Sequence, residues 1–491
     1  MKSSESRQLK FVFADSPDTL QSSGASSRGP QTYLPGQEYL LHQAEVNLTD
    51  ETDTRTTDSG QLLERVAWLP NLARALLKVA SNKGAPGVDG ESVESAVEHA
   101  PQLLANLHQA LMDGTYIPGD IRRVWIPKPG GGERGLGIPN VVDRIVQQAV
   151  LQVLEPIFEP TFHNSSHGFR RRRGAQTAIA EAKGYFAEGY GTTVDIDLSK
   201  FFDRVHHQRL LSRLAQRVGD GRILKLIHLM LKAKVVLPDG SSSPTQEGAP
   251  QGGPLSPLLS NVVLDELDWE LSRRGLRFVR YADDFSIFVR SRRAGDRVMA
   301  SVQRFIEDRL RLQVNTEKSS VSQPFDLSFL GFCLGKASDG SISVSISAKT
   351  KQRLSARVRE LTPRTWGNSF ARCVERANRY LTGWVGYFRL CTSPSSFSNF
   401  DAHIRRRLRS ILVRQKKRSR HLFRHLQTRG VSRGQAWKTA YQIRSVWKRS
   451  SSFGVHKAYS NAWFEQRLVS LCVRWKELQP APQVQGQLLL F

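Results

Sequence analysis

Two adjacent carboxylates, Asp283 and Asp284, lie between two apolar runs, residues 276–280 and 285–289. Both runs are rich in β-branched and aromatic residues, which is typical of two strands joined by a tight turn. Like charges this close raise each other's pKa unless a cation lies between them. Oxygen ligands suit a hard ion such as Mg²⁺, and a pair of such ions can activate an attacking hydroxyl and stabilise a leaving pyrophosphate. The simpler alternative is a solvated turn, because Asp is a common turn residue.

A third carboxylate lies upstream, at the end of another predicted strand. Asp197 ends an alternating run and is followed five residues later by Phe202, whose ring could close over a nucleotide sugar. Asp195 is the alternative metal ligand, or a strand residue that faces water. Asp203 is expected to cap the helix that follows, since acids are common at helix starts. We therefore expect Asp197, rather than Asp195, to share a metal with Asp283.

Several motifs, taken in their order and spacing, resemble the reverse transcriptases encoded by bacterial group II introns. The central ones are Asp197 with Phe202-Asp203, the Gly/Pro-rich segment 248–261, and Tyr281-Ala282-Asp283-Asp284. The resemblance continues through residues 83–90, 126–129, 136–139, 312–318 and 329–332, and covers roughly residues 62–478. One departure is Gly135, because the family usually has proline after Arg134.

The resemblance implies a fold and an activity. The fold is an α/β right-hand polymerase with fingers and palm, followed by an α-helical thumb or maturase domain and a basic C-terminal segment. The activity is RNA-directed DNA synthesis from a DNA primer on an RNA template, with Mg²⁺ held by Asp197, Asp283 and Asp284. A maturase function in group II intron splicing and mobility is implied as well. The alternatives are a splicing-only RNA-binding maturase and a reverse transcriptase recruited by the host for phage defence or DNA repair.

Five residues near the nascent base pair take expected roles from the resemblance. Lys128 and Arg134, on either side of a glycine-rich turn, should contact the phosphates of the incoming dNTP. Phe202 should stand against the sugar and exclude ribonucleotides, and Gln251 should border the nascent pair. Lys318 is a candidate proton donor to the departing pyrophosphate. The simpler interpretations are solvated cations, a core ring for Phe202 and a structural turn around Gln251.

The cationic charge is concentrated in the C-terminal third. The chain has 71 Lys and Arg against 45 Asp and Glu, a net charge of +26, and residues 341–491 hold 30 basic and 5 acidic residues. This asymmetry indicates a bound polyanion, with counterion release supplying much of the affinity. The cations expected to face RNA are Arg405, Arg406, Arg407 and Arg409, followed by those at 414–418. Arg122, Arg123 and the run 170–173 are expected either to contact template or intron RNA or to form solvated faces.

Length, cysteine usage and hydropathy set further bounds. With 491 residues and 39% hydrophobic content, the chain can bury a substantial core in several domains. The four cysteines lack zinc or disulfide spacing, no apolar stretch approaches a membrane span, and the N-terminus lacks a signal-peptide core. We therefore expect a cytoplasmic protein without a membrane partner. The expected partners are structured intron RNA, primer–template, dNTPs and target DNA, and a homodimer is compatible with the sequence.

Composition and periodicity predict the elements and domains that position these residues. Pro70 is expected to kink or split a helix that begins near Gln61. The other predicted elements are a β-rich segment at 114–137, helices at 143–158 and from Pro257 through Leu267, and a basic helical region after Gly335 with a loop at 392–398. The predicted domains are a disordered or lightly structured extension at 1–60, fingers at 61–140, palm at 141–335, thumb or maturase domain at 345–430, and a basic DNA/RNA-binding segment at 431–491.

Overall fold

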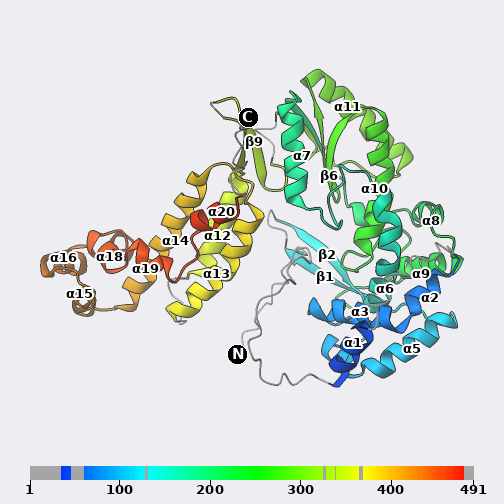
Figure 1. Ribbon diagram of the computed structural model, residues 1–491, viewed down its shortest axis with the longest axis horizontal. Coiled ribbons are helices and arrows are strands. Elements are labelled where there is room, and N and C mark those ends of the chain that lie inside the picture. The colour runs from blue at the N-terminus through cyan, green and yellow to red at the C-terminus, as the bar shows by residue number, and fades with distance from the viewer. Residues whose placement is uncertain are drawn as a thin grey trace, which may run out of the picture. The chain divides into compact units, whose positions relative to one another are not determined.

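The computed structural model describes residues 35–45, 60–127, 131–323, 328–337, 339–363 and 369–479. The chain divides into two compact units, and each unit is assembled from several stretches of sequence. Unit 1 comprises Met1–Gly174, Val194–Val289 and Arg293–Val321, and unit 2 comprises Ala175–Thr193, Arg290–Arg292 and Ser322–Phe491. Figure 1 shows the helices and strands of both units.

Unit 1 begins with a group of short helices around a common apolar core. They are α1 (Pro35–Glu45), α2 (Leu62–Ala67), α3 (Leu69–Ser81), α4 (Val93–Glu98) and α5 (Ala100–Met112). The predicted split is confirmed, because Trp68 separates α2 from α3 and Pro70 lies in the first turn of α3, where its missing N–H costs no helical hydrogen bond. Leu40 of α1 is fully buried, so this part of the predicted extension is a packed helix. The rest of residues 1–60, except Gly60, lies outside the described residues.

A mixed sheet follows, built mainly from the predicted β-rich segment. Its strands are β1 (Ile121–Pro127), β2 (Glu133–Ile138), β4 (Val235–Val236) and β5 (Ser242–Ser243), in the order β2-β1-β4-β5. β1 and β2 are antiparallel, with Trp125 opposite Gly135 and Ile126 opposite Arg134. β1 pairs with β4 only at Ile121 and Arg122.

A second sheet carries the predicted carboxylate hairpin. Its strands are β3 (Thr192–Ile196), β6 (Arg277–Tyr281), β7 (Asp284–Val289) and β8 (Ser320–Ser322), in the order β6-β7-β3-β8. The helical segments of this part are α6 (Val141–Phe158), η1 (Glu159–Thr161), η2 (Phe201–Arg204), α8 (His207–Ala215), α9 (Gly221–Lys232), α10 (Ser256–Arg273), α11 (Arg292–Arg304) and η3 (Phe305–Arg309). The helices predicted at 143–158 and from Pro257 are therefore confirmed, as α6 and α10.

The expected role of Asp203 as a helix cap is wrong. Asp203 lies inside the short 3-10 turn η2, which ends at Arg204, and the backbone is extended at Val205. The next helix, α8, begins at His207 and is capped by the side chain of His206, which accepts a hydrogen bond from the Arg209 N–H. The extended residue after the turn therefore moves the helix start beyond the reach of Asp203.

Unit 2 is mostly helical. It contains α7 (Ala175–Ala187), the hairpin β9 (Phe332–Lys336) and β10 (Ile342–Ile346), α12 (Ala348–Leu361), α13 (Phe370–Tyr387), α14 (Pro394–Gln415), α15 (Ser419–Thr428), α16 (Arg433–Trp437), η4 (Lys438–Gln442), α17 (Val446–Arg449), α18 (Phe453–Ala458), α19 (Asn461–Glu465) and α20 (Leu471–Glu477). The predicted loop at 392–398 is too long, because Pro394 begins α14. Trp384, Phe388 and Phe397 form an aromatic core, with the Trp384 and Phe388 ring centroids 4.7 Å apart. Among the described residues, no helix is both long enough and apolar enough to span a bilayer.

Candidate active site

The carboxylates Asp283 and Asp284 lie at the tip of the β6–β7 hairpin, as predicted. Tyr281 pairs with Asp284, so the connecting turn consists of Ala282 and Asp283. Ala282 has φ +58, a left-handed conformation that a non-glycine residue adopts only at a cost. The turn therefore ends at Asp283, directly before Asp284, which is the first residue of β7.

The carboxylates of the hairpin interact electrostatically with Asp195 in β3 and with Asp197 just past its end. Burial of the carboxyl group, followed by the charges of Asp283, Asp195 and Asp197, raises the pKa of Asp284 to about 7, although the residue as a whole is exposed at the start of β7. Burial also raises the pKa of Asp283, and the nearby Arg134 opposes that rise. The group thus carries an excess of negative charge over its neighbouring cations.

Asp195 and Asp197 differ in what their side chains contact. Asp195 lies within β3 and accepts a hydrogen bond from the hydroxyl of Ser286 on β7, at 2.9 Å. Burial raises its pKa. Asp197 lies just past the end of β3, and its carboxylate is 3.6 Å from the Lys318 ammonium. Asp195 is therefore bound to the neighbouring strand, whereas Asp197 meets a cation that is 67% exposed.

The donor set suits a hard divalent cation by its chemistry. The acidic side chains at the hairpin tip and just past the end of β3 are Asp283, Asp284 and Asp197, and the charges of Asp283 and Asp197 disfavour the charged form of Asp284. Within the described ranges, no three His, Cys, Asp or Glu side chains are arranged closely enough to hold a metal ion as they stand. The residue types therefore fit Mg²⁺, while the side-chain positions do not form a closed ligand cage.

A predicted phosphate-binding cation lies beside the Gly/Pro-rich loop. The Arg134 Nε on β2 donates to Oε1 of Gln251 at 2.7 Å, and the backbone N–H of Gly137 donates to the Gln251 carbonyl at 2.8 Å. Gly252 has φ +131, and a Cβ there would come within 2.5 Å of the Gly137 carbonyl oxygen. Only glycine therefore permits this approach of the loop to β2. Lys128 lies outside the described residues.

Phe202 lies under the same loop and is mostly buried. It is 7% exposed, and its ring packs edge-on against Phe201 with centroids 5.1 Å apart. Its carbonyl accepts a hydrogen bond from the Ala249 N–H at 2.7 Å. His207 Nε2 lies 2.7 Å from the Gly248 carbonyl oxygen and fastens the start of the loop. The loop and the turn that carries Phe202 thus form one packed structure.

A buried arginine that sequence reasoning did not select supports the carboxylate turn. The Arg280 side chain is fully buried and donates to both carboxylate oxygens of Asp268, which is fully buried too. The same guanidinium donates to Oδ1 of Asn261 and to the carbonyl of Ala282, each at 2.9 Å. Its signal in the sequence is an arginine that directly follows the buried pair Phe278 and Val279 of β6.

A second segment that sequence reasoning did not select also packs against that turn. A Cβ on Gly168 would approach the backbone nitrogen of Ala282 to 2.2 Å, so only glycine fits there. The carbonyl of Gly168 accepts a hydrogen bond from the Asn261 side chain at 3.0 Å. The His167 N–H donates to the carbonyl of Arg280 at 2.8 Å. The turn is thus held by α10, β6 and the segment that ends at Gly168.

The predicted RNA-facing arginines of α14 do not share one environment. Arg407 and Arg409 are 8% and 3% exposed. Arg407 donates to the hydroxyl and the carbonyl of Thr362, and Arg409 donates to the carbonyl of Tyr459. Arg406 lies over the Trp447 ring at 4.2 Å, and Arg405 is half-buried. The prediction that the whole cluster faces RNA is wrong for Arg407 and Arg409, because these side chains connect α14 to other parts of unit 2.

The arginine run at 170–173 is divided in the same way. Arg170 is 9% exposed and is paired with Glu159, with Nη2 and Oε1 3.0 Å apart. Arg171 is 66% exposed and pairs with Glu155 at 2.8 Å. Arg170 is therefore a structural residue rather than an RNA contact or part of a solvated face.

Comparison with known proteins identifies the two parts of the chain. The family described as "Reverse transcriptase (RNA-dependent DNA polymerase)" matches residues 126–334, and "Group II intron, maturase-specific domain" matches residues 351–430. Protein YkfC of Escherichia coli (strain K12) is 34% identical over 312 residues, which are 55% of this chain and 81% of YkfC. The group II intron-encoded protein LtrA of Lactococcus lactis subsp. cremoris is 30% identical over 351 residues, which are 58% of either chain.

A solved structure titled "Partial Cas6-RT-Cas1--Cas2 complex" matches more distantly. Its chain is 23% identical, with a TM-score of 0.33, over 50% of this chain and 42% of its own length. The sequence matches are the informative ones: a carboxylate hairpin and a Gly/Pro-rich loop lie within the matched polymerase segment, and a basic helical segment lies within the matched maturase domain. The chain therefore belongs to the family of group II intron-encoded reverse transcriptases and maturases, and it is an RNA-directed DNA polymerase with a maturase-specific domain.

Proposed function

We propose that Asp197, Asp283 and Asp284 form the polymerisation site and hold Mg²⁺. The observation that carries the proposal is the closeness of these carboxylates: burial and neighbouring acids raise the pKa of Asp283 and of Asp284, and a divalent cation would relieve that repulsion. Bound there, Mg²⁺ would supply Lewis-acid stabilisation of the phosphate being transferred. Asp195 is left outside the set because its carboxylate is hydrogen-bonded to Ser286.

Other side chains of the site orient the nucleotide and handle the proton. Arg134, whose Nε donates to Gln251, supplies a forked donor for the phosphates of an incoming dNTP. Lys128 is assigned to the same phosphates on the basis of the sequence motif alone. Lys318, exposed and 3.6 Å from Asp197, is the proton donor to the pyrophosphate. Phe202 limits the space beside the sugar and so selects deoxyribonucleotides; because it is mostly buried, only its edge would meet the substrate.

The domain layout follows the right-hand plan. In this proposal residues 61–140 are the fingers, 141–335 the palm and 345–430 the thumb or maturase domain. Structured intron RNA binds the exposed cations at the end of α14 and along α15, namely Arg414, Lys417, Arg418, Arg420 and Arg424. The basic segment that follows, residues 431–491, contacts target DNA.

Primer extension by an Asp283→Asn variant tests the site. Loss of dNTP incorporation is expected while the affinity for structured RNA stays unchanged, because the carboxylate binds ions and does not bind the RNA. Asp203→Asn is the matched control, since Asp203 is an exposed acid near the same site. Near-normal extension by Asp283→Asn would remove the metal assignment. Absence of extension by the unmodified protein, together with RNA binding, would favour the splicing-only alternative.

The genomic surroundings separate the remaining alternative. A reading frame that lies within an intron able to splice supports the maturase role, and splicing of that intron in vitro with and without the protein measures it. A frame without such an intron would favour recruitment of the same polymerase for host defence or DNA repair.

A further inference from the structure

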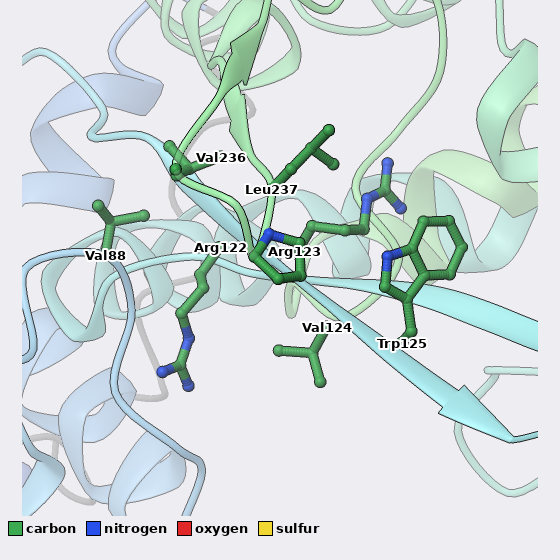
Figure 2. A pocket seen from close by; sticks show the side chains of 9 residues that line it. Val88, Arg122, Arg123, Val124, Trp125, Val236 and Leu237 are labelled. Atoms are coloured by element: carbon green, nitrogen blue, oxygen red, sulfur yellow. The ribbon is translucent and has the colours of Figure 1, made fainter.

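Strand pairing stops early in both four-stranded sheets, with different results. In the first sheet, β4 pairs with β1 only at Ile121 and Arg122, and a pocket of about 630 Å³ opens beside β1; Figure 2 shows the side chains that line it. In the second sheet, regular pairing along β3 stops beside Asp197, and the chain itself fills the gap. This second break bears on the polymerisation site, because Asp197 is a proposed metal ligand.

Just past β3, the backbone of Asp197 is paired with a segment that lies far along the chain. Leu198 and Val314 form an antiparallel bridge there, and both side chains are buried. Beside this bridge, the N–H of Asn315 donates to the carbonyl of Asp197 at 2.8 Å. The carbonyl of Asp197 is therefore held by ordinary strand pairing, anchored by two buried apolar residues.

Residues 316–319 interrupt the pairing with a turn before β8, the strand that lies beside β3. Within this turn, the N–H groups of Lys318 and Ser319 both donate to the carbonyl of Asn315, at 3.2 and 2.9 Å. In an uninterrupted antiparallel ladder that carbonyl would accept the N–H of Asp197, because paired residues exchange two hydrogen bonds. The turn therefore deprives the Asp197 N–H of its ladder partner.

The side chain of Ser319 replaces the lost partner. The N–H of Asp197 donates to Oγ of Ser319 at 3.1 Å, in a part-buried position where an unpaired N–H would cost free energy. From the same turn, the Lys318 ammonium lies 3.6 Å from the Asp197 carboxylate. Asn315, Lys318 and Ser319 thus contact the carbonyl, the carboxylate and the N–H of Asp197, respectively.

The other acid of this strand is held in a different way. Asp195 accepts a hydrogen bond from the Ser286 hydroxyl on its carboxylate, which reduces its capacity to bind an ion. Ser319 instead accepts from the backbone of Asp197, so its hydroxyl fixes the residue without occupying the carboxylate. A ligand that is fixed before an ion arrives loses less conformational entropy when the ion binds.

We propose that Ser319 is a positioning residue of the polymerisation site. Its hydroxyl holds the backbone of Asp197 so that the carboxylate is set for a divalent cation shared with the acids of the β6–β7 hairpin. Ser319 acts through Asp197 and touches neither the cation nor the nucleotide. The proposal rests on the proposed function, because it takes Asp197 as a metal ligand.

Direct binding of Mn²⁺ tests the proposal without nucleotide addition, because Mn²⁺ takes the same oxygen ligands as Mg²⁺ and the unbound ion is counted by electron paramagnetic resonance. Ser319→Ala should weaken Mn²⁺ binding by about tenfold, the loss that outer partners of a metal ligand cause when removed. Ser320→Ala is the matched control: it removes the hydroxyl of the next residue, which is exposed at the start of β8, and should leave the affinity unchanged.

Ser319→Thr and Ser319→Val separate the hydrogen bond from the packing of the turn. The two variants have the same branched shape, and only threonine keeps the hydroxyl. Ser319→Thr should therefore bind Mn²⁺ nearly as tightly as the unmodified protein, and Ser319→Val as weakly as Ser319→Ala. Equal Mn²⁺ affinities of the Thr and Val variants would overturn the proposal. So would a lower melting temperature of metal-free Ser319→Ala with an unchanged Mn²⁺ affinity, because that pattern marks a purely structural residue.

Asp197→Asn distinguishes failure of the positioning role from failure of the metal assignment. Weak Mn²⁺ binding by Asp197→Asn beside normal binding by Ser319→Ala would overturn the role of Ser319 alone. Unchanged Mn²⁺ binding by Asp197→Asn would overturn the assignment of Asp197 as a ligand, and the role of Ser319 with it. The double variant Asp197→Asn/Ser319→Ala should lose no more affinity than Asp197→Asn, because Ser319 acts through Asp197. A further loss in the double variant would show that Ser319 acts elsewhere and would overturn the proposal.

Discussion

Asp284 has a pKa raised from 3.8 to about 7 by burial and by three neighbouring carboxylates. The folded protein therefore binds a proton at Asp284 more tightly than the unfolded chain does. By linkage, ionisation of Asp284 reduces the free energy of unfolding progressively as pH rises from about 4 to about 7, and the reduction is complete above that range. In the absence of metal, the negative charge of Asp284 therefore destabilises the folded protein.

We predict that Asp284→Asn raises the melting temperature of the metal-free protein at about pH 8 and leaves it unchanged below about pH 4. Mg²⁺ should stabilise the unmodified protein more than the variant at the higher pH, because the ion binds the folded state through this carboxylate. Thermal unfolding with and without Mg²⁺ at both pH values measures this. A variant that is stabilised equally at both pH values would show that the charge of Asp284 is not the cause.

At the scale of elements, the β6–β7 turn depends on the buried polar group beneath it. Arg280 is the only group among those described that contacts Asp268, Asn261 and the Ala282 carbonyl together. We predict that Arg280→Met destabilises the protein by about 3–5 kcal/mol, since it leaves the buried Asp268 carboxylate without a partner. Chemical denaturation measures this loss.

The double variant Arg280→Met/Asp268→Leu separates stability from positioning. Removing both charges should recover much of the stability, because no isolated buried charge remains. The turn at Ala282 still lacks its anchor, so kcat for primer extension should stay low while KM for dNTP changes little. Full recovery of kcat in the double variant would mean that Arg280 acts only through the fold.

Local patterns predicted several elements correctly for identifiable reasons. The split at Pro70 and the hairpin around Asp283 follow from residues whose preferences act within a few positions. The environment of Arg409 could not be predicted in this way, because its partner Tyr459 lies 50 residues away in sequence. The same holds for Arg280, whose role depends on α10 packing beneath β6. A cation in a sequence indicates charge, and only tertiary structure shows whether that charge meets solvent.

At the scale of the whole molecule, the surplus of positive charge must be divided into exposed and buried parts. We predict that replacing Arg418, Arg420 and Arg424 by Gln weakens binding of structured RNA and reduces the steepness of its salt dependence by roughly 0.7–0.9 log units per lost phosphate contact. RNA affinity measured over a range of salt concentrations checks this. Extension of a short pre-annealed primer–template at saturating concentration should persist.

Arg407→Gln and Arg409→Gln serve as the comparison. These side chains hold carbonyls of unit 2, so their loss should lower the melting temperature more than that of the exposed set. An unchanged salt slope for the exposed triple variant would place the RNA surface elsewhere.

The division into two compact units also limits where the chain can be cut into fragments that each keep a complete unit. Unit 2 contains residues 175–193, which precede most of the second sheet (β6-β7-β3-β8) in sequence. Within unit 2, the Gln176 side chain donates to the carbonyl of Tyr387 at 3.2 Å. A fragment that begins at residue 322 therefore lacks α7, and a fragment that ends at residue 321 carries α7 without its partners. No single cut yields both units intact. Exchange of a maturase domain between relatives by one crossover would leave α7 to fit a foreign partner, so functional chimaeras should require α7 to be transferred together with the C-terminal part.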